Sequence, residues 1–440
     1  MYITLVACCV LLNAGVAVHL LAQSQFDPRK KKLFVVAAVA STAFKLVLAS
    51  RWSDFDLLSY GTVASFVLQG KSFYAHTQYY NYAPAWALIV TGLQQISAVL
   101  PALHGQAFHF AIAAFLAVAD VTLASLLATK YKYEAGIFYL CCPVAIFLTG
   151  LYSQFEDFAL LVGLASWLLI RTGNVPWRRV VTAAALLGLS VIIKHVLFLF
   201  PIWVLLWPRL GSLWKRLAYG AIAYGMFALS FLPWAIDSAS RAGIYEHVFH
   251  YRSRFFFSLL HLLAASRDFW HIPAAETSLL TLVWIAALIA AGFMVGRGKS
   301  ELFPMYLLAM FAVSPALNDY YYAIPMLACA IFFPSFPVWA WISTTLVAYF
   351  ASPGNVFAFT FSRVYYVAMA SSQIIIGVLF IVQKRRADRQ DALASPPPEI
   401  AGKALALAMG SMAIVFLFIL IKAWAFGMTS ATWLLPADNG

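Results

Sequence analysis

The stretch RWSDFDLLSYGTVASFVLQGKSFYAHTQYYNYAPAW, residues 51–86, follows one apolar run and precedes many more. It places two carboxylates, Asp54 and Asp56, directly after the preceding run ends. Acidic side chains are costly inside a membrane and common where a chain leaves it. The stretch therefore predicts a polar segment at a membrane surface, provided that the apolar runs on either side of it lie in a membrane.

The composition indicates whether the chain is a soluble or a membrane protein. Of 440 residues, 63% are hydrophobic and only 10% are charged, whereas a soluble domain carries about 25% charged residues. Apolar runs recur along nearly the whole length, which predicts one all-α, polytopic helical membrane domain over residues 1–440. The net charge of +12 does not indicate nucleic-acid binding, because the basic residues lie in short loops between apolar runs.

The first apolar run, from Tyr2 to about Leu21, is predicted to be a retained helix and not a signal peptide. It lacks a basic start and a convincing small-residue cleavage site, and RKKK follows at residues 29–32. These cations predict that the helix ends in the cytoplasm. The next helix, Leu33 to Ser50, then emerges on the outer face at Arg51.

The later loops set the predicted topology. Basic, and hence cytoplasmic, loops are predicted around residues 130–132, 178–179, 209–216, 297–299 and 384–389. They alternate properly with outer loops only if the apolar stretch Ala83 to Ala102 does not cross. We expect a re-entrant or interfacial helix there, flanked by Pro84 and Pro101. The prediction is then about 14 transmembrane helices with both termini outside.

Three segments outside the helices are distinguished. The long first outer loop spans residues 51–106, a second outer loop spans residues 237–276, and a polar, proline-rich cytoplasmic linker spans residues 384–402. No internal repeat is visible, which argues against a transporter built from two similar halves. The five cysteines lie in apolar runs, and neither CxxC nor Cys/His spacing suggests zinc.

Asp54 and Asp56 precede a short helix predicted over Leu57 to Leu68. A carboxylate at this position can serve as general base towards a hydroxyl, especially where partial desolvation raises its pKa. The second acid can hold or tune the first. The alternative is helix capping by one of the two acids together with ordinary solvation at the interface. The spacing alone leaves both interpretations open.

The order of motifs in this loop resembles the first luminal loop of the GT-C glycosyltransferases. After the acid-x-Asp pattern, Gly70 follows Asp56 by fourteen residues, and SFY (72–74) and YNYAPAW (80–86) come next. Family members carry Asp-x-Asp, Gly-x-(Ser/Pro)-Tyr and Tyr-x-Tyr-x-Pro in this order. The chain looks most like the family of catalytic subunits of GPI mannosyltransferase I and their bacterial multi-pass relatives.

The resemblance extends over about Arg51 to Pro208. It includes Asp120 inside the next helix, a Cys-Pro pair at 142–143, the polar cluster LYSQFEDFALL at 151–161 and the lysine-bearing SVIIKHVLFLFP at 190–201. There are departures from the family. Cys-Pro replaces the commoner Asn-Pro, and Gln-Phe-Glu-Asp stands where relatives often have Gly-Asn-x-Asp or Gly-Gln-x-Asp. These departures bear on the sugar and the acceptor.

The resemblance implies inverting transfer of a hexose, with mannose the first expectation, from a polyprenyl-phosphate sugar to a lipid-linked or glycan acceptor. The reaction is expected on the outer face of a bacterial cytoplasmic membrane. Asp56 is the first candidate for the base, because its spacing to Gly70 matches the more constant acid of the family, and Asp54 is the second. No cofactor is expected, although two acids can bind a divalent cation.

The donor phosphate needs cations, and four candidates follow. Lys194 and His195 lie in an apolar run, and Arg252 and Arg254 lie in the second outer loop, where a guanidinium suits a phosphate. Each has an alternative. Lys194 can be neutralised by Asp120 or snorkel to an interface, His195 can be a hydrogen-bonded core residue, and the arginines can face solvent or lipid headgroups.

The remaining candidates are polar groups for the sugar or acceptor. The intramembrane Asp120 needs a partner, and Glu156 and Asp157 open a helix, where acids also suit the helix dipole. For Asn318, Asp319 and Tyr320 an ordinary loop is the alternative. The predicted substrate-binding group is Asp120, Gln154, Glu156, Asp157, Tyr80 and Tyr82.

Two other functional classes remain open. A transporter or flippase for a lipid-linked or anionic substrate would also use buried Lys, Asp and His. A non-catalytic assembly subunit is the third possibility. The acid pair in a long outer loop favours the enzyme.

Overall fold

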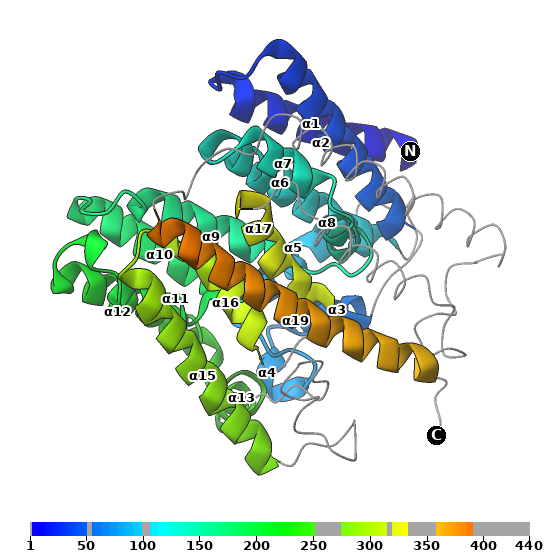
Figure 1. The fold of residues 1–440 in the computed structure, drawn as a ribbon. Helices are drawn as coiled ribbons and strands as arrows, with labels where there is room; N and C mark the ends of the chain where they lie inside the picture. The colour runs from blue at the N-terminus through cyan, green and yellow to red at the C-terminus, as the bar shows by residue number, and fades with distance from the viewer. Residues whose placement is uncertain are drawn as a thin grey trace.

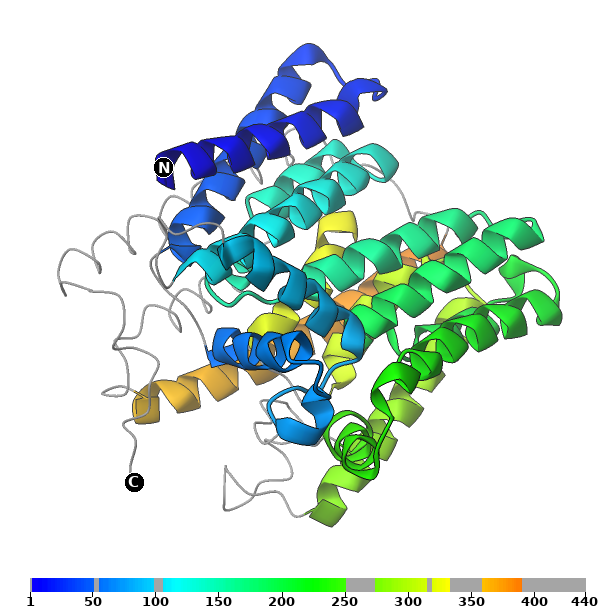
Figure 2. The same cartoon turned by 180° about the vertical axis from the view of Figure 1, so that it is seen from behind.

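The computed structural model describes residues 2–50, 55–98, 106–250, 274–314, 319–332 and 358–389. Throughout these ranges the regular elements are helices, and none of these residues forms a strand (Figures 1 and 2). The helices are α1 (Tyr2–Ala22), α2 (Pro28–Ala49), α3 (Phe55–Leu68), α4 (Phe73–His76), α5 (Pro84–Ala98), α6 (Ala107–Lys130), α7 (Tyr133–Leu140), α8 (Pro143–Gly150), α9 (Glu156–Ile170), α10 (Trp177–Ile193), α11 (Phe200–Leu205), α12 (Leu213–Leu229), α13 (Ser238–Ile244), α15 (Ala274–Gly296), α16 (Leu302–Val313), α17 (Ala323–Phe332) and α19 (Ala358–Asp388). Single turns are η2 (His195–Leu197), η3 (Pro208–Leu210), η4 (Leu232–Trp234), η5 (Tyr245–Phe249) and η6 (Asp319–Tyr322).

The described residues confirm the all-helical class, and several of their helices are long and apolar enough to cross a membrane. Four candidate spans are Thr4–Ala22, Pro28–Ala49, Ala107–Lys130 and Leu213–Trp234. The pair α7 and α8 forms a fifth candidate, bent by 48° at the break before Pro143. The other predicted crossings fall on helices that are not among these candidates, or outside the described residues, so the count of about 14 stays a prediction.

Helix α2 begins five residues earlier than the sequence prediction of Leu33. Asp27 precedes its first turn, and the Asp27 carboxylate accepts a hydrogen bond from the Arg29 backbone N–H at 2.7 Å. Pro28 occupies the first turn, where its missing N–H is no loss. The basic residues 29–32 are therefore part of the helix and not of a preceding loop. A capped, proline-initiated turn outweighs the polarity of the segment.

Helix α5 corresponds to the stretch predicted not to cross. It has 15 residues, or about 22 Å at 1.5 Å per residue, whereas a crossing needs about 20 residues. Pro84 begins it, as the sequence suggests. Its length supports a re-entrant or interfacial helix, and its side of the membrane stays a prediction.

Hydrogen bonds inside the first outer loop fix α4 and α5. The buried Tyr80 hydroxyl donates to the Ala83 carbonyl at 3.0 Å and accepts from the Ala87 N–H at 2.9 Å, at the start of α5. The Tyr74 hydroxyl donates to the Tyr82 carbonyl at 2.7 Å. These bonds give the aromatic motif of this loop a local structural role.

The segment predicted to be the first outer loop packs against the start of the segment predicted to be the second. A Cβ on Gly243 of α13 would lie 1.9 Å from the Tyr74 carbonyl oxygen, so only glycine permits this contact with α4. The Phe73 ring lies 4.7 Å from the Trp234 ring, centroid to centroid. The contact supports the prediction that both loops lie on the same side.

Helices α9, α10 and α12 lie side by side, as Figures 1 and 2 both show. The Ser190 hydroxyl of α10 donates to the Ala159 carbonyl of α9 at 2.7 Å, and the Ser166 hydroxyl of α9 donates to the Ala183 carbonyl of α10 at 2.6 Å. A short connection makes α9 and α10 antiparallel. The start of α9 therefore meets the end of α10, and this junction carries the candidate site.

Candidate functional site

Four polar side chains, here called the Asp56 cluster, meet at this junction: Asp56, Gln154, Glu156 and Lys194. Gln154 Nε2 donates to Asp56 Oδ2. Gln154 Oε1 accepts from Lys194 Nζ at 3.2 Å, and the same ammonium forms an ion pair with Glu156 Oε1. One carboxamide therefore connects a carboxylate to a lysine that already has a counter-ion.

Local backbone geometry places each member of the cluster. Asp56 lies in the first turn of α3. Lys194 is the extended residue directly after α10, with φ −151° and ψ 131°. Ser153 has φ 54°, a left-handed conformation that is uncommon for a residue with a side chain, and the Gln154 N–H donates to the Leu148 carbonyl at 2.9 Å. This tight turn brings Gln154 between Asp56 and Lys194.

Aromatic rings enclose the lysine. Lys194 Nζ lies 4.5 Å from the Phe155 ring centroid and 4.8 Å from that of Tyr82, distances at which a cation is attracted to the ring face. Trp86 stacks on Phe155 with centroids 4.2 Å apart. The rings come from the first outer loop and the α8–α9 connection, so the same contacts that bury the ammonium hold α5 against the cluster.

The polar side chains of this region differ in exposure. Lys194 and Gln154 are each 1% exposed and Glu156 is fully buried, whereas Asp56 and His195 are partly exposed. The His195 ring lies 5.9 Å from the Tyr82 ring, centroid to centroid. Asp56 is therefore the most exposed member of the cluster, and the partly exposed His195 borders it.

The environment of Asp56 acts on its acidity in two directions. Burial raises the pKa of the Asp56 carboxyl above its ordinary value, while the hydrogen bond from Gln154 and the charge of Lys194 lower it. Asp56 lies in the first turn of α3, a helix that is shorter than the candidate membrane spans and is not counted among them. A carboxylate with a raised pKa is a better proton acceptor than an ordinary aspartate.

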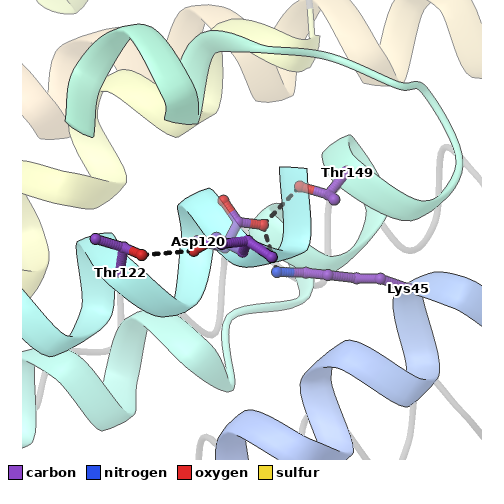
Figure 3. Close-up of polar contacts among 5 residues, drawn as sticks. Lys45, Asp120, Thr122 and Thr149 are labelled. Atoms are coloured by element: carbon purple, nitrogen blue, oxygen red, sulfur yellow. Dashed lines mark hydrogen bonds and ion pairs between the residues drawn. The ribbon is translucent and has the colours of Figure 1, made fainter. Parts of the chain in front are cut away.

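A second buried ion pair lies beside this cluster and involves a residue that the sequence prediction missed. Lys45 Nζ of α2 lies 2.5 Å from Asp120 Oδ2 of α6, and the Thr149 hydroxyl of α8 donates to the same oxygen at 2.7 Å (Figure 3). Both charged side chains are at most 1% exposed. The available signal was Lys45 itself, a lysine inside an apolar run and therefore expensive without a partner.

The structure answers how the buried charges are paired. The sequence predicted that Asp120 needs a partner, and the structure shows that this partner is Lys45. The alternative in which Asp120 neutralises Lys194 is wrong, because Lys194 pairs with Glu156. A lysine at the end of α10 meets the start of its antiparallel neighbour α9 and not the middle of α6. Asp157, the next residue, is also buried and faces Tyr139.

The other predicted residues fall into three groups: those that border the Asp56 cluster, one that bonds within its own loop, and those that the structure does not describe. Tyr82 and His195 border the Asp56 cluster, whereas both hydrogen bonds of the Tyr80 hydroxyl are to the loop itself. The remaining candidates lie outside the residues, or the side chains, that the structure describes: Asp54, Arg252, Arg254, Asn318, Asp319 and Tyr320.

Two further observations concern a cavity and metal binding. A cavity of about 440 Å³ lies between α1 and α6, lined by Leu12, Gly15, Val16, His19, Leu20 and Thr122, none of which belongs to the Asp56 cluster. Within the described ranges, no group of three or more His, Cys, Asp and Glu side chains could hold a metal ion.

The chain was also compared with known proteins. No family model matches it. No curated protein and no solved structure matches it either. The resemblance to the GT-C glycosyltransferases therefore rests on the sequence motifs alone.

Proposed function

We propose that this protein is a membrane glycosyltransferase of the GT-C type that uses a polyprenyl-phosphate sugar. It transfers a hexose, with mannose as the first candidate, to a lipid-linked or glycan acceptor on the outer face of a bacterial cytoplasmic membrane. One observation carries the proposal: Asp56, chosen from the motif spacing, is partly exposed and is held through Gln154 by the buried Lys194.

The proposed chemistry is a single displacement at the anomeric carbon. The Asp56 carboxylate takes the proton of the acceptor hydroxyl as its oxygen bonds to that carbon, and the bond to the phosphate oxygen breaks. The lipid phosphate leaves with the electron pair on the opposite side. The partly exposed His195 lies beside Tyr82 and is the residue that we assign to a hydrogen bond with the substrate.

The placement of Lys194 changes the role proposed for it. Its charge is already matched by Glu156, and an ion pair offers a phosphate much less attraction than a free cation. We assign Lys194 to the orientation of Gln154. Arg252 and Arg254 remain the proposed phosphate ligands.

A transporter is the second candidate, because two ion pairs buried among helices also suit a substrate or proton pathway. Purified protein incubated with labelled polyprenyl-phosphate sugars and an acceptor mixture distinguishes the two. Transfer with release of lipid phosphate supports the enzyme. Relocation of intact substrate across vesicles, with no phosphate release, supports the transporter.

The decisive variant is Asp56→Asn, which keeps the shape of the side chain and removes its basicity. Donor binding should survive, while transfer falls by at least about a hundredfold. Asp54→Asn is the matched control and should have a smaller effect. Full turnover in Asp56→Asn would exclude it as the base, and a larger loss in Asp54→Asn would give that role to Asp54.

A further inference from the structure

The Lys45–Asp120 ion pair is attached to the segment that carries Gln154. Thr149, the residue before the end of α8, donates its hydroxyl to Asp120 Oδ2 at 2.7 Å. The next residue, Gly150, is pressed against α2, because a Cβ there would lie 2.8 Å from both the Cα and the carbonyl oxygen of Lys45. The end of α8 is thus held by α2 and α6 at once.

From this anchor the chain folds back on α8 before it reaches the cluster. The N–H groups of Leu151 and Tyr152 donate to the Phe147 carbonyl at 2.8 and 3.2 Å. The Gln154 N–H donates to the Leu148 carbonyl at 2.9 Å. Only three residues separate the anchored Gly150 from Gln154, so a displacement of α8 moves the Gln154 side chain as well.

We propose that Lys45 is a positioning residue: its ion pair with Asp120 holds the end of α8, and thereby Gln154 and the Asp56 carboxylate, in place. The catalytic part of this inference rests on the proposed function. The mechanical part does not, because the position of residues 149–154 can be measured without any substrate.

The first test is hydrogen exchange on the full chain in detergent. In Lys45→Met, peptides covering residues 148–155 should exchange at least about tenfold faster than in the wild type, while peptides from the middle of α10 are unchanged. Ser166→Ala is the matched control, because it removes a buried hydrogen bond of α9 that lies away from α8. It should leave residues 148–155 protected.

A single change leaves Asp120 buried without its lysine, so the variant can fail to fold. The double variant Lys45→Met with Asp120→Leu removes both charges and avoids that difficulty, and it also removes the acceptor of the Thr149 hydroxyl, so the anchor is lost. Fast exchange at 148–155 in the double variant supports the proposal. Wild-type exchange there overturns it.

Activity gives the second readout. If Lys45 acts through Asp56, the double variant should lose about tenfold in kcat with the donor KM within about twofold, and Lys45→Arg should recover most of the loss. An unchanged kcat beside faster exchange overturns the link to Asp56. If the wild type transfers no sugar while exchange responds as expected, the proposed function fails and the mechanical role of Lys45 stands.

Discussion

The two buried ion pairs, Lys194–Glu156 and Lys45–Asp120, are alike in burial and differ in the third group that each one binds. In both, the side chains of the lysine and the carboxylate are at most 2% exposed. The third group is the Thr149 hydroxyl in one pair and the Gln154 carboxamide in the other.

The difference lies in what the third group can do next. The Thr149 hydroxyl donates its one proton to Asp120, and the arrangement ends there. A carboxamide carries an acceptor and a donor at once, so Gln154 accepts from Lys194 and donates to the partly exposed Asp56. The comparison teaches that the Lys194 pair is linked to the partly exposed Asp56 directly through Gln154, whereas the Lys45 pair can act on Asp56 only by holding the end of α8.

The largest expected effect comes from breaking either pair. Asp120→Asn and Glu156→Gln each leave a buried lysine without its counter-ion, and each should lower the free energy of unfolding by about 3–5 kcal/mol. Thermal or denaturant unfolding in detergent measures this loss. Removing both charges, as in Lys45→Met with Asp120→Leu, should restore most of the stability. Equal losses in single and double variants would contradict the assignment of the pair.

A smaller effect on the rate of transfer is expected when the link between the Lys194 pair and Asp56 is removed. Gln154→Met keeps the length of the side chain and removes both hydrogen bonds, so transfer should fall by about tenfold, which corresponds to about 1.4 kcal/mol. The same change removes an interaction that lowers the pKa of Asp56.

The pH dependence of transfer should report that change directly. A base acts only when deprotonated, so the rate should fall in acid through the raised pKa of Asp56. In Gln154→Met this acidic limb should move to higher pH, and in Asp56→Asn it should disappear from the residual rate. A limb that stays in place in both variants would assign the titration to another group.

The smallest effect is expected at Thr149. Thr149→Val removes one buried hydroxyl and retains the ion pair, so stability should fall by about 1 kcal/mol and transfer by no more than about threefold. Unfolding and transfer assays on the same preparation check both values. A loss comparable to that of Lys45→Met would show that the Thr149 hydroxyl is the main link between the ion pair and α8.

Much of the site was predictable because its members carry local signals. Asp56 follows from motif order, Lys194 from its position in an apolar run, and Glu156 from the start of a helix. Lys45 was missed because it belongs to no motif. The early start of α2 was missed because the capping bond of Asp27 outweighed the polarity of the basic segment.

The sequence by itself determined the membrane environment, the helical class and the residues around which a site can form, because hydropathy, helix period and motif spacing are properties of neighbouring residues. Only the tertiary structure decided which charge meets which. Lys45 and Asp120 are 75 positions apart, and Asp56 and Gln154 are 98 apart. Burying a charge is tolerable only beside its partner, and helix packing alone determines which partner is within reach.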